Sequence, residues 1–171
     1  LFRSGHRPEL CRWVGRMLAR ELLSKGFFEQ VDAIVPVPLH WRRLWKRGYN
    51  QSHEMALGVA ELTQLPILKH AVKRVRNNAS QTRMTAQERF ENVRDLFRGR
   101  EGLPCRHLLL VDDVLTTGAT MIACAQAIHE TNSHVRFSFL TLARTQEGII
   151  PVRHPDDSGE ETSSDVAGVL Q

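Results

Sequence analysis

The chain contains 171 residues, of which 42% are hydrophobic and 25% charged, and its formal net charge is +4 at pH 7. These proportions are ordinary for a globular protein and exclude collagen-like, coiled-coil and wholly disordered classes. No stretch approaches the roughly 20 apolar residues that span a membrane, and the first residues contain no apolar signal segment. We therefore expect one soluble cytoplasmic domain with no membrane insertion.

Positive charge is concentrated in the middle of the chain. Residues 42–100 contain 13 basic and 5 acidic residues, whereas residues 151–171 contain 1 basic and 5 acidic residues. The basic excess would attract phosphates or nucleic acid, although a solvated basic face is the simpler interpretation. The Ser-, Asp-, Glu- and Gly-rich end predicts a disordered acidic tail at 148–171 after a single domain at 1–147.

The expected elements begin with a helix and continue with strands that alternate with helices. Apolar residues at helical spacing predict a helix at 8–23, and an apolar run cut by prolines predicts a strand at 33–38. Further along we expect a helix that Ser52 caps and that ends near Leu65, followed by a strand-like segment at 67–75 and a polar loop at 76–83. A short helix should start at 85, and a brief strand should follow at 96–97. The last expected elements are a strand at 107–111, a helix ending near 129 and a strand at 136–142. This alternation predicts an α/β fold whose parallel sheet is covered on both faces.

The most informative segment is Leu108–Thr120, with the sequence LLLVDDVLTTGAT. Its apolar start predicts a central strand, and two carboxylates, Asp112 and Asp113, follow at the carboxyl end. The turn into the next helix would offer backbone N–H groups to an anion, with Gly118 permitting close approach and threonine hydroxyls adding donors. The carboxylates would bind a ribose diol, directly or through Mg²⁺. A simple capped turn is the alternative interpretation.

Together these residues resemble the 5-phosphoribosyl pyrophosphate (PRPP) motif of the type I phosphoribosyltransferases. A second segment, Val31–Gln51, reads VDAIVPVPLHWRRLWKRGYNQ and is similar to the signature of the ComF family, the competence-associated branch of these proteins. A third segment, Gln81–Asn92, matches the middle segment of that family. The three motifs occur in the family's order, and the resemblance covers about residues 8–144.

The resemblance implies a type I phosphoribosyltransferase fold, with a mostly parallel central sheet of roughly five strands flanked by helices. It assigns the ribose hydroxyls to Asp112 and Asp113, which are also the candidate catalytic and Mg²⁺-binding residues. The 5-phosphate of PRPP would lie against Thr116, Thr117, Gly118, Ala119 and Thr120. The pyrophosphate loop would be formed around Pro38, Leu39, His40, Arg43 and Arg47. A mobile loop that closes over the site would carry Arg76, Ser80, Gln81 and Arg83.

Two functions remain open from the sequence. The first is an Mg²⁺-dependent transferase that moves 5-phosphoribosyl from PRPP to an unidentified small-molecule nucleophile and releases pyrophosphate, whose charge nearby arginines would neutralise. The second is a non-catalytic accessory protein of DNA uptake, with a PRPP-type ligand pocket and a basic face for single-stranded DNA or a helicase. A homodimer is compatible with either function.

Several residues bear on these alternatives. Relatives that use 6-oxopurines carry an Asp where this chain has Thr116, so a hypoxanthine or guanine acceptor is not expected. The family's N-terminal zinc ribbon is absent from residues 1–171, so we expect it to precede Leu1 or to be lacking. Trp41 and Trp45 alternate with basic residues and would suit base stacking, although their helical spacing favours packing in the core. His40 would either donate to phosphate or cap a turn.

Overall fold

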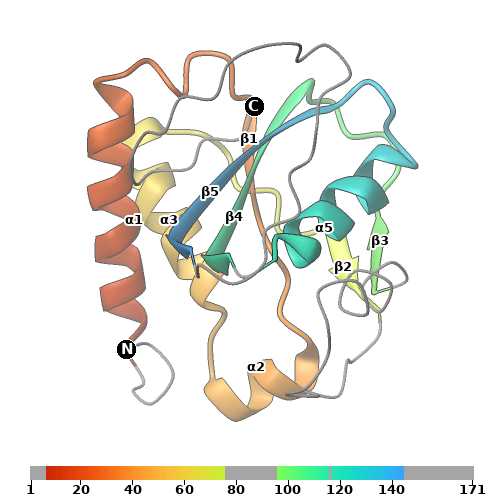
Figure 1. Cartoon of the computed structure of the whole chain (residues 1–171), viewed down its shortest axis with the longest axis horizontal. Coiled ribbons are helices and arrows are strands. Elements are labelled where there is room, and N and C mark those ends of the chain that lie inside the picture. The colour runs from red at the N-terminus through yellow and green to blue at the C-terminus, as the bar shows by residue number, and fades with distance from the viewer. Residues whose placement is uncertain (1–6, 76–95, 116, 145–171) are drawn as a thin grey trace.

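The computed structural model describes residues 7–75, 96–115 and 117–144. Their central element is a parallel sheet with the strand order β1-β4-β5 (Figure 1). Its strands are β1 (Ala33–Pro36), β4 (His107–Leu115) and β5 (Arg136–Arg144). The helices are α1 (Pro8–Leu23), α2 (Trp41–Arg47), α3 (Gln51–Thr63) and α5 (Ala119–His129). Two short strands, β2 (Val72–Arg74) and β3 (Phe97–Gly99), pair antiparallel as a separate sheet near α5.

Apolar residues of β4 form the centre of the protein because both faces of this strand are covered. Leu108 and Leu110 belong to the core that α5, β2 and β3 complete, whereas Leu109 and Val111 belong to the core formed with α1 and α3. Successive residues of a strand point to opposite faces, and a strand buried on both faces therefore needs an unbroken apolar run. The run at the start of β4 meets this requirement.

Two glycines allow α1 and α3 to approach closely. A Cβ atom placed on Gly15 of α1 would overlap the backbone carbonyl oxygen of Met55, and one placed on Gly58 of α3 would overlap that of Arg12. Each glycine thus faces the backbone of the opposite helix. The absence of a side chain at these positions sets how closely the two helices approach.

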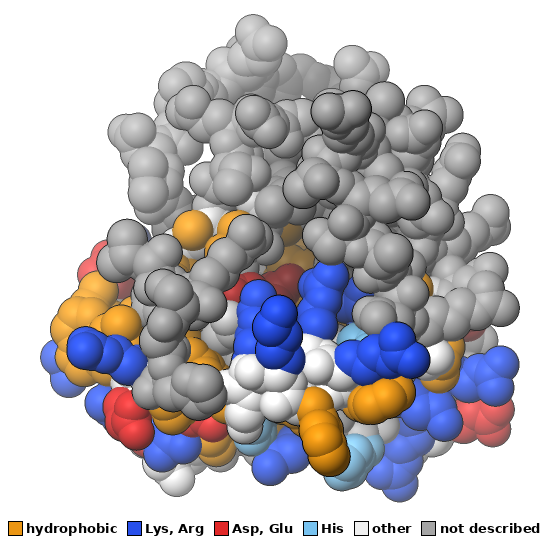
Figure 2. Space-filling view, turned by 90° about the horizontal axis from the view of Figure 1, so that it is seen from below, with side chains coloured by type: hydrophobic (Ala, Val, Ile, Leu, Met, Phe, Trp, Pro, Cys, Tyr) orange, Lys and Arg blue, Asp and Glu red, His pale blue; other side chains and the backbone are white. Residues whose placement is uncertain are grey.

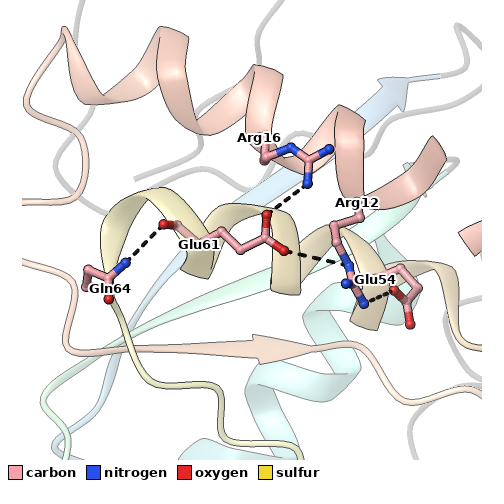
Figure 3. Close-up of polar contacts among 5 residues, drawn as sticks. All are labelled: Arg12, Arg16, Glu54, Glu61 and Gln64. Carbon is pink, nitrogen blue, oxygen red and sulfur yellow. Dashed lines mark hydrogen bonds and ion pairs between the residues drawn. The ribbon is translucent and has the colours of Figure 1, made fainter. Parts of the chain in front are cut away.

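Ion pairs run along the same helix pair (Figure 3). Arg12 of α1 donates from Nη2 to Oε2 of Glu54 in α3 at 2.8 Å. One turn along α1, Arg16 donates from Nη1 to Oε2 of Glu61, also at 2.8 Å. These contacts orient α1 on α3, and α3 in turn carries residues of the site described below.

Asp32 holds the amino ends of β1 and β4 together. Its Oδ2 accepts hydrogen bonds from the backbone N–H groups of Arg106 and His107, at 2.7 and 2.8 Å. These two bonds lower the pKa of the exposed Asp32 carboxyl group. They lie at the amino edge of the sheet, opposite the edge that carries the Asp-Asp pair.

The structure confirms the α/β class and the expected helix at 8–23, but it changes several details. The strand expected at 107–111 continues to Leu115, and the segment expected at 67–75 forms a strand only at Val72–Arg74 with a single bridge at Ile67. Within the described residues the parallel sheet has three strands rather than about five. The loop expected at 76–83, the helix from 85 and the tail at 148–171 lie outside the described residues.

Two further corrections concern the cap of α3 and the exposure of two side chains of α2. Asn50, not Ser52, caps α3, because its Oδ1 accepts from the N–H of Ser52 at 3.2 Å. The preference for core packing of Trp41 and Trp45 was wrong, since their side chains are 61% and 88% exposed. No helix within the described ranges is long and apolar enough to cross a membrane.

Candidate functional site

The Asp-Asp pair lies near the carboxyl end of β4, inside the strand rather than beyond it. Asp112 is opposite Thr141 of β5 in the parallel register, and the strand continues for three residues after it. The Asp112 carboxylate is oriented by two donors, because its Oδ1 accepts from the Ser52 hydroxyl and from the Asp113 N–H, both at 2.9 Å. The hydroxyl of Ser52 and the backbone of β4 therefore hold one carboxylate oxygen, and the Asp113 side chain is also within hydrogen-bond reach of the Asp112 carboxyl group.

The two carboxylates lie close together, and each also affects a cysteine in a different helix. Burial raises the pKa of the Cys124 thiol in α5, and the charge of Asp112 adds to this effect. Burial likewise raises the pKa of the Cys11 thiol in α1, and there the charge of Asp113 adds to it. The charge of Asp112 is thus felt in α5 and that of Asp113 in α1, while the two carboxyl groups remain close enough to hydrogen-bond to each other.

Burial is the main reason that the pKa of Asp112 rises to about 7, and the adjacent charge of Asp113 raises it further. The hydrogen bonds from Ser52 and from the backbone oppose this rise but do not cancel it. The Asp112 carboxyl group is therefore partly protonated near neutral pH. A cation or a hydrogen-bond donor that enters the site would favour its charged form.

We expect Asp112→Asn to make the protein more stable than the wild type at pH 8 and not at pH 4. An unfolded Asp titrates near pH 3.9, about three units below the folded value, so wild-type stability falls as pH rises from about 4 to 7. The amide carries no charge and can still accept the Ser52 bond. The expected gain at pH 8 is about 1 to 4 kcal/mol in urea unfolding.

Asp32→Asn is the matched control, and its effect should have the opposite sign. Because the folded-state pKa of Asp32 is lowered, its stabilising contribution is present above the unfolded pKa and is lost as pH falls. This variant should be less stable than the wild type at pH 8. A destabilised Asp112→Asn at pH 8 would contradict a costly buried charge at that position.

The turn after β4 leads into α5 through Gly118, whose φ of 77° lies in the left-handed region that glycine adopts readily. The N-cap residue, Gly118, makes no side-chain capping bond to α5, and the first turn of the helix contains no acidic residue. Within the turn, the N–H of Ala119 donates to Oγ1 of Thr117 at 3.4 Å. The positive end of the helix dipole, together with Thr120, thus suits an anion. Thr116 lies outside the described residues.

The expected pyrophosphate loop is shorter than the sequence indicated, because α2 starts at Trp41. Only Pro38, Leu39 and His40 of the expected set lie in the loop. His40 caps α2, since its Nδ1 accepts from the N–H of Arg42 at 3.3 Å. The structure therefore agrees with the interpretation that His40 caps a turn. Because Nδ1 accepts this bond, the proton of the neutral ring is on Nε2.

Asn50 and the end of α2 hold this loop in place. The Asn50 amide donates from Nδ2 to the carbonyl oxygen of Val37 at 3.0 Å, just before the loop. Arg47 donates from Nη1 to Oε1 of Gln51 at 2.9 Å, which joins the end of α2 to the start of α3. Arg47 thus has a structural contact, whereas Arg43 lies earlier on α2 beside His40.

Arginines of β2 and α2 gather around His40, and one of them, Arg74, also lies near Asp112. Burial lowers the pKa of Arg74 in β2, and the charge of Arg43 lowers it further, against an opposing effect of Asp112. Burial also lowers the pKa of His40, followed by the charges of Arg74, Arg42 and Arg43. Arg74 lies over the ring of Phe97, with its guanidinium carbon 5.5 Å from the ring centroid. Crowded cations of this kind gain from a bound anion.

Figure 2 looks onto this end of the molecule and shows acidic side chains recessed between Lys and Arg side chains. The fold thus brings together the Asp-Asp pair, the start of α5 and the cationic groups around His40. The expected mobile-loop residues Arg76, Ser80, Gln81 and Arg83 lie outside the described residues. Sequence reasoning missed the role of Ser52, although its position directly after the Asn50-Gln51 end of the ComF-like run was the available signal.

The residues present fit a magnesium ion that is shared with a ligand. Carboxylate oxygens are the donors that Mg²⁺ prefers, and it usually retains water and phosphate oxygens as well. Among the described residues, no group of three or more His, Cys, Asp or Glu side chains could hold a metal ion alone. Asp112 and Asp113 would therefore hold Mg²⁺ only together with water or oxygens of a bound ligand.

Comparison with known proteins gives the same fold family. A family model described as a phosphoribosyl transferase domain matches residues 45–170. Competence protein F of Haemophilus influenzae is 34% identical over 119 residues, which cover 64% of this chain and 52% of that protein. DNA utilization protein YhgH of Salmonella typhimurium is 35% identical over 126 residues, which cover 71% of this chain and 55% of that protein.

The chain spans about half the length of these curated relatives. A crystal structure of a purine phosphoribosyltransferase from Pyrococcus horikoshii is 14% identical, with a TM-score of 0.46 over 86% of this chain and 91% of that chain. The family model alone covers well over half of the chain and includes the Asp-Asp pair and the turn into α5.

Proposed function

Because this chain belongs to the phosphoribosyl transferase family and, within it, to the ComF proteins, we propose that it binds PRPP with Mg²⁺ and transfers its 5-phosphoribosyl group. The acceptor is a nucleophile of unassigned structure, and pyrophosphate is the second product. The observation that carries the proposal is the meeting of three parts at one sheet edge. These parts are the Asp-Asp pair, the start of α5 after Gly118, and Arg74 with the cationic groups around it near Asp112.

Each part suits a different portion of PRPP. The start of α5, with Thr117, Gly118 and Thr120, would receive the 5-phosphate, because backbone N–H groups and the helix dipole favour an anion there. Asp112 and Asp113 would accept hydrogen bonds from the two ribose hydroxyls. The pyrophosphate would lie toward the His40 loop and the guanidinium groups of Arg74, which lies near Asp112, and of Arg43, which lies near Arg74.

Transfer would break the bond between the anomeric carbon and pyrophosphate while the acceptor forms a new bond to that carbon. The transition state has oxocarbenium character, with positive charge on the sugar and negative charge on the departing group. Arg43 and Arg74 would stabilise the negative charge as it develops, and the Asp112 carboxylate would stabilise the positive charge of the sugar. Bound Mg²⁺ would supply further charge neutralisation on pyrophosphate.

Thermal unfolding with PRPP and Mg²⁺ tests this proposal. At a ligand concentration about a hundred times the Kd, binding contributes about 2.7 kcal/mol, which raises the Tm by about 5 to 10 °C for a domain of this size. Ribose 5-phosphate and pyrophosphate, each with Mg²⁺, are the matched controls and should give smaller shifts because each occupies only part of the site. An unchanged Tm at millimolar PRPP would count against the site.

A second function is favoured by the surface of α2, which buries none of its residues. Trp41 and Trp45 are exposed, and the guanidinium carbon of Arg42 lies 5.2 Å from the centroid of the Trp41 ring. Figure 2 shows hydrophobic side chains that stand among Lys and Arg side chains on this face. Exposed aromatic rings among cations suit the stacked bases and phosphates of single-stranded DNA. The protein would then act as an accessory factor in DNA handling, alone or with a helicase.

Salt dependence of binding to a fluorescent single-stranded oligonucleotide tests the second function. Affinity should fall steeply with added salt, because each neutralised phosphate releases a counterion. Trp45→Ala should weaken binding about tenfold or more, since a stacked base contributes about 1 to 3 kcal/mol. Lys46→Ala should reduce the salt slope by about 0.7, whereas Lys25→Ala, in the turn after α1, should not. Binding that is absent or insensitive to salt would remove this function.

A further inference from the structure

Asn50 connects the two parts of the site that would hold pyrophosphate and ribose. Its Nδ2 donates to the carbonyl oxygen of Val37 at 3.0 Å, and its Oδ1 accepts from the N–H of Ser52 at 3.2 Å. The Ser52 hydroxyl then donates to Oδ1 of Asp112 at 2.9 Å. A continuous series of hydrogen bonds thus runs from the start of the His40 loop (residues 38–40), through the cap of α3, to the Asp-Asp pair.

Few other contacts determine the position of the His40 loop. Just before the loop, the N–H of Val37 donates to the carbonyl oxygen of Val111, the residue before Asp112, at 2.9 Å. At its other end the loop leads into α2, which buries none of its residues and lies at one end of the molecule (Figure 1). Among the described residues, the Asn50 bond is the only side-chain hydrogen bond that joins Val37 or the loop to α3.

The chemistry of an amide suits this connection. Asn50 uses its oxygen to cap α3 and its nitrogen to hold Val37, whereas a carboxylate at this position would offer acceptors only. The next two residues, Gln51 and Ser52, are 3% and 4% exposed, so little water is available to replace these bonds. Hydrogen bonds in such surroundings are costly to break, because a buried polar group would lose its partner. The connection between the loop and α3 is therefore a rigid one.

We propose that Asn50 is a positioning residue that sets the distance between the His40 loop and the Asp-Asp pair, so that the site selects a ligand whose pyrophosphate is attached to its ribose. The inference rests on the proposed function, in which the loop faces pyrophosphate and Asp112 faces ribose. A ligand that spans both parts gains from a fixed separation, because binding does not have to order the loop. A ligand that occupies the ribose part alone gains little.

Calorimetric titration with PRPP and with ribose 5-phosphate, each with Mg²⁺, tests this role. Asn50→Ser retains a cap for α3, since Ser and Asn are comparable N-caps, but its side chain is too short to hold Val37. PRPP should then bind about tenfold more weakly, near the upper end for one neutral hydrogen bond. The affinity for ribose 5-phosphate should change by less than about twofold, because the cap and Asp112 remain in place.

A second variant removes the same bond without shortening the side chain. Asn50→Asp keeps the acceptor that caps α3 but places a carboxylate oxygen, in place of a donor, against the carbonyl of Val37. The ratio of the PRPP affinity to the ribose 5-phosphate affinity should fall at least as far as in Asn50→Ser. Agreement between the two variants would exclude both a cavity and an added charge as the sole cause.

Two control variants distinguish positioning from a general loss of structure. Ser52→Ala acts on Asp112 and should weaken PRPP and ribose 5-phosphate by the same factor, so the ratio should not change. Asn132 is a buried asparagine that likewise accepts from one backbone N–H, of Leu103, and donates to one carbonyl, of Arg100. It follows the last turn of α5, whereas the site lies at the first, so Asn132→Ser should lower stability and leave the ratio unchanged.

The outcomes separate this inference from the proposed function. A wild-type chain that binds PRPP, together with an unchanged affinity ratio in Asn50→Ser and Asn50→Asp, would overturn the positioning role alone. A wild-type chain that binds neither ligand would overturn the proposed function and this inference with it. An equal fall of the ratio in Asn132→Ser would assign the effect to lost stability and would also contradict the role.

Discussion

Replacing both Asp112 and Asp113 by Asn should weaken binding of PRPP with Mg²⁺ by at least about a hundredfold. A hydrogen bond to a charged group contributes about 1.5 to 3 kcal/mol, so the loss of two exceeds the 2.8 kcal/mol or so that corresponds to that factor. The amide retains the shape of the carboxylate and can accept the Ser52 bond that orients Asp112. Isothermal titration calorimetry at pH 8 would measure the change.

The same variant separates the loss of binding from the loss of folding. Removing the buried charge of Asp112 should increase stability at pH 8, so the double variant should bind more weakly while it unfolds at no lower urea concentration. Asp32→Asn is the control for binding, because Asp32 lies at the amino edge of the sheet, where its carboxylate accepts from the backbone N–H groups of Arg106 and His107. Unchanged PRPP affinity in the double variant would refute the role of the carboxylates.

Gly58→Ala should lower the free energy of unfolding by about 2 to 3 kcal/mol, near the upper end for overpacking in a well-packed interior. The new methyl group would overlap the backbone carbonyl of Arg12, and a backbone atom cannot rotate away as a flexible side chain can. The helices would have to separate, which would loosen the core between them and the sheet. This loss should exceed the gain of up to about 1 kcal/mol that alanine brings to a helix. Urea unfolding followed by circular dichroism would measure the effect.

Gly15→Ala should have a similar effect, because its methyl group would overlap the carbonyl of Met55 from the other side of the same contact. Arg20→Ala, at an exposed position of α1, is the control and should change stability by no more than about 0.5 kcal/mol. A Gly58→Ala protein as stable as the wild type would mean that α1 and α3 can move apart at little cost.

The sequence predicted the Asp-Asp pair and the turn into α5 well because these parts are contiguous in the chain. An apolar strand, two acids and a Thr-Thr-Gly turn follow one another within Leu108–Thr120, so local rules are enough to place them at one edge of a sheet. The strand's end was misjudged, because Asp112 remains paired with Thr141 of β5. Pairing with a neighbour extends a strand beyond what its own apolar pattern indicates.

Contacts between distant segments were not predictable in this way. Ser52 was expected to cap a helix, yet its hydroxyl donates to Asp112, which is 60 residues away in the chain. Trp41 and Trp45 were expected to pack in the core because they share one helix face. Spacing shows which residues share a face but not what the face meets, and α2 lies at the end of the molecule where no core is available.

By itself, the sequence determined the α/β class, the positions of α1 and α5, and a segment suited to a sugar and a phosphate. Each of these depends on short-range patterns of apolar, acidic and turn-forming residues. The tertiary structure alone decided that Ser52 orients Asp112, that Arg74 lies near Asp112 and is itself joined by Arg43 and His40, and that the pKa of Asp112 rises to about 7. Burial and the approach of charges from separate elements exist only once the chain has folded, and they set the electrostatic properties of the site.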